Sequence, residues 1–361
     1  MIENRRGYGI GLAGRFYEKV VAPRLTDQPH AAALLGPGSE VLGYDDATST
    51  DHGFGPRVQI FVADSDAVAT TEQRFADLDG AFEGMPVRFP RYDDEPATHQ
   101  VRVTTPAEFF AGWLGVDPAA GLSVADWLLI PTQVLGSMIA GAVFHDPDGE
   151  LADRRAALEW YPDDVWRYAL ASAWLRIGQE EPFVGRAGAR GDDLGSRIVA
   201  ARLVREMMRL TFLLERRYPP YQKWFGHAFA ELELAGKLAP LLDRALLTGF
   251  WRDREDALCE AARLLGTATN GLELAEPVDP APRQFHHRDI QVAGGERYTI
   301  ALTKTILDPA VRAVLEHFGH RHDGSVPSLP GTIDQAIDST DVLGDVAACR
   351  AAAALLGVSG A

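Results

Sequence analysis

The chain has 361 residues, of which 46% are hydrophobic and 24% are charged, and this composition predicts a folded protein of two domains or of one extended domain. Its 35 Lys and Arg residues against 51 Asp and Glu residues give a formal net charge of −16, which argues against extended nucleic-acid binding because such a chain repels a phosphate backbone. The first residues contain no apolar segment of the signal-peptide type, so we expect a cytoplasmic protein.

The first third of the chain predicts a mixture of helices and strands. Apolar residues at helical spacing predict a helix over 14–25. The pattern Gly9-x-Gly11-x-x-Gly14 before it matches a dinucleotide-binding motif, but no strand precedes it, so we expect a flexible lead-in to that helix. Apolar and β-branched runs next to Gly, Pro or polar residues predict three strands, at 32–35, 58–62 and 100–104. Pro106 then opens a predicted helix through Trp113.

The middle of the chain changes to long helical periods, from Val124 to about Leu274. Residues 127–144 carry no charge and approach the length of a membrane span. Pro131, Gly136 and Gly141 dilute this apolar run, so we predict a buried helix and no membrane partner. The Pro-rich connector 276–282 then begins a C-terminal α/β extension.

One motif joins the first two predicted strands. Gly38-Ser39 follows the first strand, and Asp51-His52-Gly53 precedes the second. This order resembles the DNA polymerase beta-like nucleotidyltransferase superfamily, whose pattern is Gly-Ser, a gap of this length, and Asp-x-Asp at the head of a strand. The resemblance implies that Gly and Ser approach triphosphate oxygens, while carboxylates at alternate strand positions point the same way and hold Mg²⁺.

The position of the second metal-binding carboxylate is occupied by Gly53, so Asp51 stands alone in the pattern. The third predicted strand, residues 100–104, offers no carboxylate either. Four acidic residues lie nearby in sequence and are alternative ligands: Asp45, Asp46, Asp64 and Asp66. The other interpretation places these residues in solvated turns of an intact fold whose metal site is degraded.

A second polar constellation lies in the helical segment. Arg202, Arg205 and Arg209 follow one another at helical spacing and predict a basic stripe. Cations and aromatic residues, among them Lys223, surround Pro219-Pro220 a little further on. Such a cluster suits a triphosphate or a stacked base. The alternative is a set of ordinary surface ion pairs with Glu206 and Glu215.

With these residues assembled, the chain resembles the bacterial domain-of-unknown-function 4037 family over nearly its full length. The stretches that carry the resemblance are Gly38–Asp46, Ser49–His52, Phe54–Arg57, Gly195–Arg197, Tyr221–Gly226 and Asp338–Asp341. The resemblance implies an α+β protein: a nucleotidyltransferase-like mixed-sheet domain at 1–115, a helical domain at 116–275 and a C-terminal α/β extension at 276–361. In family members an acidic residue commonly follows the His of Asp-His, and Gly53 departs from that pattern.

These patterns lead to one leading hypothesis for the function. A nucleoside triphosphate binds between Gly38-Ser39 and the basic cluster, and its nucleotidyl group passes to a small molecule or a protein. Asp51 holds Mg²⁺ and acts as the catalytic carboxylate, Ser39 contacts the phosphates, and Lys223 or Arg209 balances their charge. The rivals are a catalytically lapsed nucleotide-binding or regulatory protein, which Gly53 favours, and an interaction protein that binds a partner through its helices.

Overall fold

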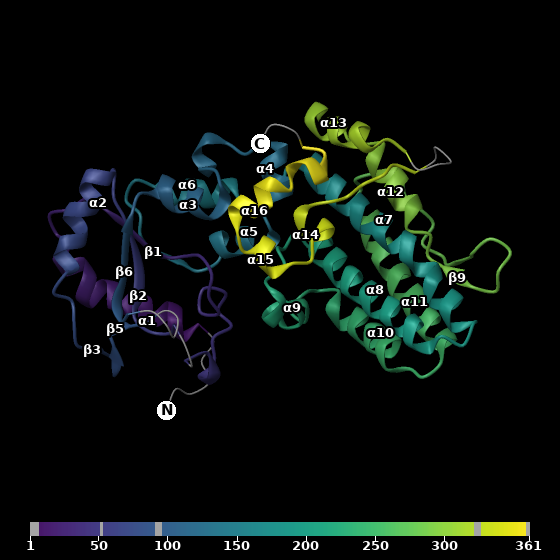
Figure 1. Cartoon of the computed structure of the whole chain (residues 1–361), viewed down its shortest axis with the longest axis horizontal. Helices are drawn as coiled ribbons and strands as arrows, with labels where there is room; N and C mark the ends of the chain where they lie inside the picture. The colour runs from purple at the N-terminus through teal and green to yellow at the C-terminus, as the bar shows by residue number, and fades with distance from the viewer. Residues whose placement is uncertain (1–6, 51–52, 91–95, 321–325, 359–361) are drawn as a thin grey trace. The chain divides into compact units, whose positions relative to one another are not determined.

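The computed structural model describes residues 7–50, 53–90, 96–320 and 326–358, and it confirms the predicted α+β class. The chain divides into two compact units, which Figure 1 shows with their helices and strands labelled. Unit 1 comprises Met1–Leu122 and Gln133–Glu159, and unit 2 comprises Ser123–Thr132 and Trp160–Ala361.

Unit 1 is built on a five-stranded mixed sheet with the strand order β5-β6-β2-β1-β7. The strands are β1 (Ala31–Leu34), β2 (Arg57–Phe61), β5 (Arg88–Phe89), β6 (Thr98–Thr104) and β7 (Ala142–His145). Strand β2 pairs antiparallel with β1 and parallel with β6. The three predicted strands are therefore confirmed as neighbours in one sheet, with ends displaced by one or two residues. A separate small hairpin joins β3 (Ala81–Phe82) to β4 (Met85–Pro86).

The two faces of the parallel pair β2–β6 differ in chemistry, because alternate residues of a strand point to opposite sides of the sheet. Val58 and Ile60 pair with Val101 and Val103, and all four lie in one hydrophobic core together with Phe16. The residues between them form the opposite face, which is polar: Arg57, Gln59, Gln100 and Arg102. The register therefore places two arginines and two carboxamides together on one side of the sheet.

Helix α1 (Tyr8–Phe16) contains the Gly-x-Gly-x-x-Gly pattern, so the predicted flexible lead-in is wrong. These glycines are helical because the helix packs closely against distant side chains. A Cβ on Gly9 would lie 2.4 Å from Glu40 Cβ, and one on Gly14 would lie 3.2 Å from the ring of Phe144. The helical path then continues through a π-helical segment (Tyr17–Val21) and a 3₁₀ turn (Ala22–Arg24).

Helix α3 (Pro106–Leu114) begins where the sequence predicts it. Thr105 and Glu108 form a capping box, and Pro106 occupies the first helical position, where no backbone N–H is needed. Gly115 ends the helix with a φ of 75°. The remaining helices of this unit are α2 (Ser65–Glu72), α5 (Thr132–Ile139, whose first residue belongs to unit 2) and α6 (Glu150–Ala157).

The uncharged stretch 127–144 is not the single buried helix that the sequence predicts. It forms the end of α4 (Val124–Leu129), then α5, then the strand β7. Pro131 separates the two helices, and Gly141, with a φ of 73°, precedes the strand. Across the described residues, no helix combines the length and the apolar character that a membrane span requires.

Unit 2 is mainly helical, and it combines most of the predicted helical domain with residues 276–361, whereas Gln133–Glu159 belongs to unit 1. Its helices are α4, α7 (Asp163–Gly188), α8 (Asp193–Leu214), α9 (Gln222–Phe229), α10 (Ala235–Leu247), α11 (Trp251–Gly271), α12 (Glu296–Thr303), α13 (Pro309–Phe318), α14 (Ile333–Ala336), α15 (Thr340–Leu343) and α16 (Val346–Ala351). A two-stranded sheet joins β8 (Arg283–Gln284) to β9 (Gln291–Val292). Helix α12 packs against α7, so residues 276–361 belong to the same compact unit as the long helices.

Candidate functional site

The turn that carries Gly38 and Ser39 follows β1 and is fixed from both sides. Val41 is buried with Ala13 and Leu34 in a small apolar cluster. Gly38 has a φ of 151°, and a Cβ at this position would lie 2.6 Å from Arg57 Nη2 and 2.6 Å from Glu40 Oε2. The missing side chain of Gly38 therefore makes room for two charged side chains of the protein itself.

Arg57 ties this turn to the start of β2. Its guanidinium lies 2.5 Å from Glu40 Oε1 and donates a hydrogen bond of 3.1 Å to the carbonyl of Pro37. Both charged side chains are largely buried, with 13% and 12% of their surfaces exposed. Gln59, on the same face of the strand, donates to the carbonyl of Leu35 and accepts from its N–H, both at 3.0 Å. The polar face of β2 thus positions the turn before Gly38.

A cleft of about 290 Å³ opens over this polar face. Its lining comes from the turn, β2, β6, α2 and α3: Leu35, Pro37, Arg57, Val58, Gln59, Glu72, His99, Gln100, Val101, Arg102, Phe109 and Trp113. The lining thus combines aliphatic and aromatic side chains with arginine and carboxamide groups. The single carboxylate among these residues belongs to Glu72, which is exposed.

Arg102 gives this cleft its positive character. Its side chain is exposed, and its guanidinium lies 6.0 Å from the centre of the Phe109 ring. Within the described ranges, no carboxylate forms an ion pair with Arg102. In a chain with a net charge of −16, this is an arginine on a cleft wall that is available to an anion. Arg57, by contrast, has its charge balanced by Glu40.

The predicted metal-binding residue, Asp51, lies outside the described residues. Gly53 lies in the turn before β2, four residues from the start of that strand, and has a φ of 62°. It therefore does not occupy an alternate position on the strand. The described part of the chain contains no group of three or more His, Cys, Asp or Glu side chains that would hold a metal ion. The Mg²⁺ prediction depends on Asp51 and stays a prediction.

The four alternative carboxylates cap or flank local structure. Asp45 is buried and accepts hydrogen bonds from Gly7 N at 3.2 Å and Gly9 N at 2.7 Å, at the start of α1. Asp46 accepts from Thr48 N and Ser49 N in the next turn. Asp64 is the N-cap of α2, and Asp66 lies exposed in the first turn of that helix. Asp46 and Asp64 agree with the interpretation as turn residues, whereas Asp45 is buried and Asp66 belongs to a helix.

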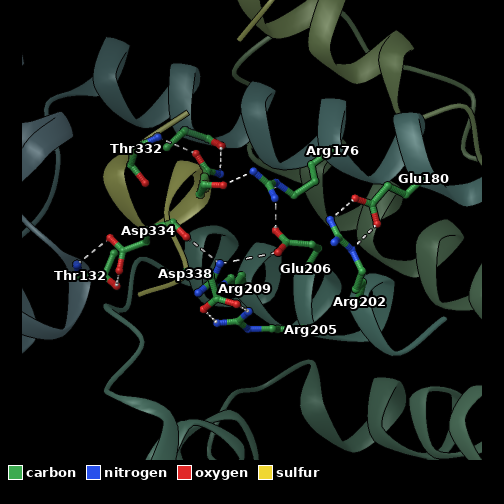
Figure 2. Close-up of polar contacts among 12 residues, drawn as sticks. Thr132, Arg176, Glu180, Arg202, Arg205, Glu206, Arg209, Thr332, Asp334 and Asp338 are labelled. Atoms are coloured by element: carbon green, nitrogen blue, oxygen red, sulfur yellow. Dashed lines mark hydrogen bonds and ion pairs between the residues drawn. The ribbon is translucent and has the colours of Figure 1, made fainter. Parts of the chain in front are cut away.

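The basic stripe of α8 lies in unit 2, where it is engaged by acidic groups of the protein. Figure 2 shows these contacts. Arg202 Nη2 lies 2.5 Å from Glu180, and Arg205 Nη1 lies 2.7 Å from Asp338. Arg209 Nη1 lies 3.6 Å from Glu206 and 2.8 Å from the carbonyl oxygen of Asp334. The expected pairing with Glu206 is present, whereas Glu215 accepts hydrogen bonds from the backbone of Glu233 and Leu234.

The C-terminal segment from Thr332 to Asp338 is anchored by this stripe (Figure 2). Asp334 accepts hydrogen bonds from Thr132 N at 2.9 Å and Thr132 Oγ1 at 3.0 Å, at the start of α5. Burial raises the pKa of Asp334, while the hydrogen bond from Arg205 lowers the pKa of Asp338. Burial also raises the pKa of Glu206. Together with Arg176 of α7, which contacts the carbonyl of Gln335, these groups hold the segment to α7 and α8.

The predicted nucleotide-binding residues are distributed over both units. Gly38 and Ser39 belong to unit 1, whereas Arg209 and Lys223 belong to unit 2, so neither unit alone contains the predicted set. Lys223 is exposed at the start of α9, with Nζ 5.0 Å from the centre of the Trp224 ring.

The cleft residues Arg102, Gln59 and Trp113 were not predicted as functional. The signal was present, because polar residues alternate with valines over 100–104. The sequence does not show that the polar residues of β6 lie on the same face of the sheet as Arg57 and Gln59 of β2.

Comparison with known proteins gives one family match. Residues 127–225 match the family model described as a domain of unknown function, DUF4037. No curated protein matches this chain. Among solved structures, the chain is similar to a nucleotidyltransferase-like protein from Exiguobacterium sibiricum, with 13% identity and a TM-score of 0.30 over 76% of this chain and 82% of the other. The resemblance to the DUF4037 family is thus confirmed over residues 127–225, and the predicted likeness over nearly the full length of the chain stays a prediction.

Proposed function

We propose that unit 1 is a nucleotidyltransferase-like domain that binds a nucleoside triphosphate in the cleft over the polar sheet face. The observation that carries the proposal is the exposed guanidinium of Arg102, which has no acidic partner among the described residues and lies on a cleft wall in an acidic chain. The phosphates bind against Arg102 and beside the turn that contains Gly38 and Ser39.

The lining groups suit phosphate oxygens. A guanidinium presents several N–H donors in one plane and binds phosphate through paired, charge-assisted hydrogen bonds. The carboxamide of Gln100 donates to Phe89 and Thr98, so Arg102 is the phosphate-binding group of this strand, while the pair Arg57–Glu40 fixes the turn. In this proposal the Ser39 hydroxyl donates to a phosphate oxygen. Lys223 of unit 2 stays a prediction as a further phosphate-binding residue.

Binding without transfer is the first candidate activity, and nucleotidyl transfer to a small molecule or a protein is the second. Transfer of this type uses carboxylates that hold Mg²⁺ against the phosphates. The positions of the polar face that the structure describes, Arg57, Gln59, Gln100 and Arg102, carry no carboxylate. This donor set favours a binding or regulatory role, and Asp51 is the residue on which transfer depends.

The proposal is tested by titrating the full-length protein with each of the four nucleoside triphosphates, with and without Mg²⁺, by calorimetry and by thermal melting. A ligand that binds the folded state raises the melting temperature. Arg102→Gln is expected to weaken binding by roughly 10- to 100-fold, because a hydrogen bond to a charged group contributes about 1.5–3 kcal/mol.

Arg15→Gln is the matched control. It removes the same charge from unit 1, at an exposed ion pair with Glu83 that does not line the cleft. This variant is expected to bind as the parent does. If no triphosphate binds at millimolar concentration, or if Arg15→Gln and Arg102→Gln weaken binding equally, the cleft is not the nucleotide site.

A further inference from the structure

Trp113 is the half-buried aromatic side chain of the cleft, and the cleft lining places it with Arg57 and Arg102. It lies in the last turn of α3, beside the turn that leads from β1 to Ser39. Gly36 lies in this turn, and a Cβ built on it would lie 3.8 Å from Trp113 Nε1, which is an ordinary contact distance. The edge of the indole therefore borders the turn that the phosphates are proposed to reach.

The surroundings of Trp113 differ from those of the other tryptophans. The chain has seven tryptophans, and six of them have an aromatic or cationic partner: Trp127, Trp160, Trp166, Trp174, Trp224 and Trp251. Trp113 has no ring or cation stacked on it and no acceptor for its Nε1–H, as far as the described residues extend. Its neighbour Phe109 is fully packed, against Phe61, Phe110 and Arg102.

We infer that Trp113 stacks on the base of the bound nucleotide. This inference rests on the proposed function, because it concerns the same cleft and adds the group that recognises the nucleoside. The lining combines a cationic group, Arg102, with the apolar side chains of Leu35, Phe109 and Trp113. A nucleotide has the same division, a charged phosphate chain and a flat π-surface, and an indole face stacks on a base without requiring a particular base.

Base stacking and phosphate binding are separated by two probes, a nucleoside triphosphate and inorganic tripolyphosphate. Tripolyphosphate carries the phosphate chain but no base. The full-length parent is expected to bind the nucleoside triphosphate more tightly than tripolyphosphate. Trp113→Ala is expected to weaken binding of the nucleoside triphosphate by about 5- to 100-fold, as expected for the loss of one stacked base, and to leave tripolyphosphate binding unchanged.

Trp113→Phe is the matched variant, since it retains an aromatic face of smaller area and is expected to recover most of the affinity. Tryptophan fluorescence gives a second readout, because ligand-induced quenching of the parent signal should be lost in this variant.

Three results would overturn the inference. The first is equal affinity of Trp113→Ala and the parent for the nucleoside triphosphate. The second is equal weakening of both probes by Trp113→Ala, which would show that the indole only supports the turn. The third is equal affinity of the parent for both probes, since the base then adds nothing. If the parent binds neither probe, the proposed function itself fails, which is a different result from the first three.

Discussion

The close contact at Gly38 makes an alanine at this position destabilising. Gly38→Ala places a methyl group 2.6 Å from Arg57 Nη2 and from Glu40 Oε2, at a φ of 151° that alanine rarely adopts. The backbone strain costs about 1–3 kcal/mol. The two side chains have to rotate apart, and their hydrogen bond is worth about 1.5–3 kcal/mol. We therefore expect Gly38→Ala to lower the free energy of unfolding by about 2.5–6 kcal/mol.

Gly43 supplies the matched control in the same turn. Its φ is 71°, and a Cβ there meets no atom within 4 Å, so Gly43→Ala introduces backbone strain alone, worth about 1–2 kcal/mol. The assay is urea unfolding of the parent and both variants, followed by triphosphate titration of each. Gly38→Ala is expected to be the less stable variant and to bind the triphosphate more weakly. Equal stability losses in the two variants would refute the argument that Gly38 is required by Arg57 and Glu40.

Three further predictions concern stability. Burial raises the pKa of Glu255 from its ordinary value of 4.5 to about 7, so this group stabilises the protein at low pH, and the contribution is lost as the pH rises between these two values. Glu255→Gln should therefore raise the melting temperature more at pH 8 than at pH 5. An equal change at both pH values would contradict this prediction. Arg254 is fully buried and donates a hydrogen bond of 2.5 Å to Ser196. Arg254→Met should therefore lower the free energy of unfolding in urea by about 3 kcal/mol. Arg252→Met removes an exposed ion pair with Asp289 and should change that free energy little. Asp45→Ala removes the cap of α1 and should cost about 1–2 kcal/mol whether or not Mg²⁺ is present, and a loss that appears only with Mg²⁺ would mark Asp45 as a metal ligand.

The central sheet could be predicted from the sequence because its signals are local. Each of the strands β1, β2 and β6 is a short apolar or β-branched run, next to Gly, Pro or polar residues. The pairing of the strands has no such local signal, because the parallel register of β2 and β6 joins residues about 43 positions apart, such as Arg57 and Gln100. The polar face of the sheet, and with it the cleft, depends on that register.

One error of the sequence prediction, at α1, and one alternative that it left open, at α8, have the same physical origin. The glycines of α1 indicated flexibility by their intrinsic preference. Packing overrode this preference, because Gly9 and Gly14 allow Glu40 and Phe144 to approach the helix closely. The arginines of α8 indicated an anion site, but Arg205 pairs with Asp338, which lies 133 residues further along the chain. Neither partner can be identified from the spacing of residues within the helix itself.

The decision between nucleotide binding and nucleotidyl transfer rests on Gly53. An aspartate on a strand next to Asp51 would complete a pair of ligands, but Gly53 lies four residues before β2 and has a φ of 62°. Aspartate tolerates this conformation better than most residues, so Gly53→Asp should fold. Its side chain would project from a turn instead of a strand face, so we expect no Mg²⁺-dependent turnover from this variant.

Pyrophosphate release from each triphosphate, measured for the parent, Gly53→Asp and Asp51→Asn, tests this expectation. We expect all three proteins to show no turnover while the parent binds the triphosphate. Robust turnover by the parent that is lost in Asp51→Asn would refute the binding-only interpretation and make Asp51 the catalytic carboxylate. Turnover that appears only in Gly53→Asp would show that one missing carboxylate separates this chain from an active transferase, because a second acidic ligand is then enough to hold Mg²⁺ against the phosphates.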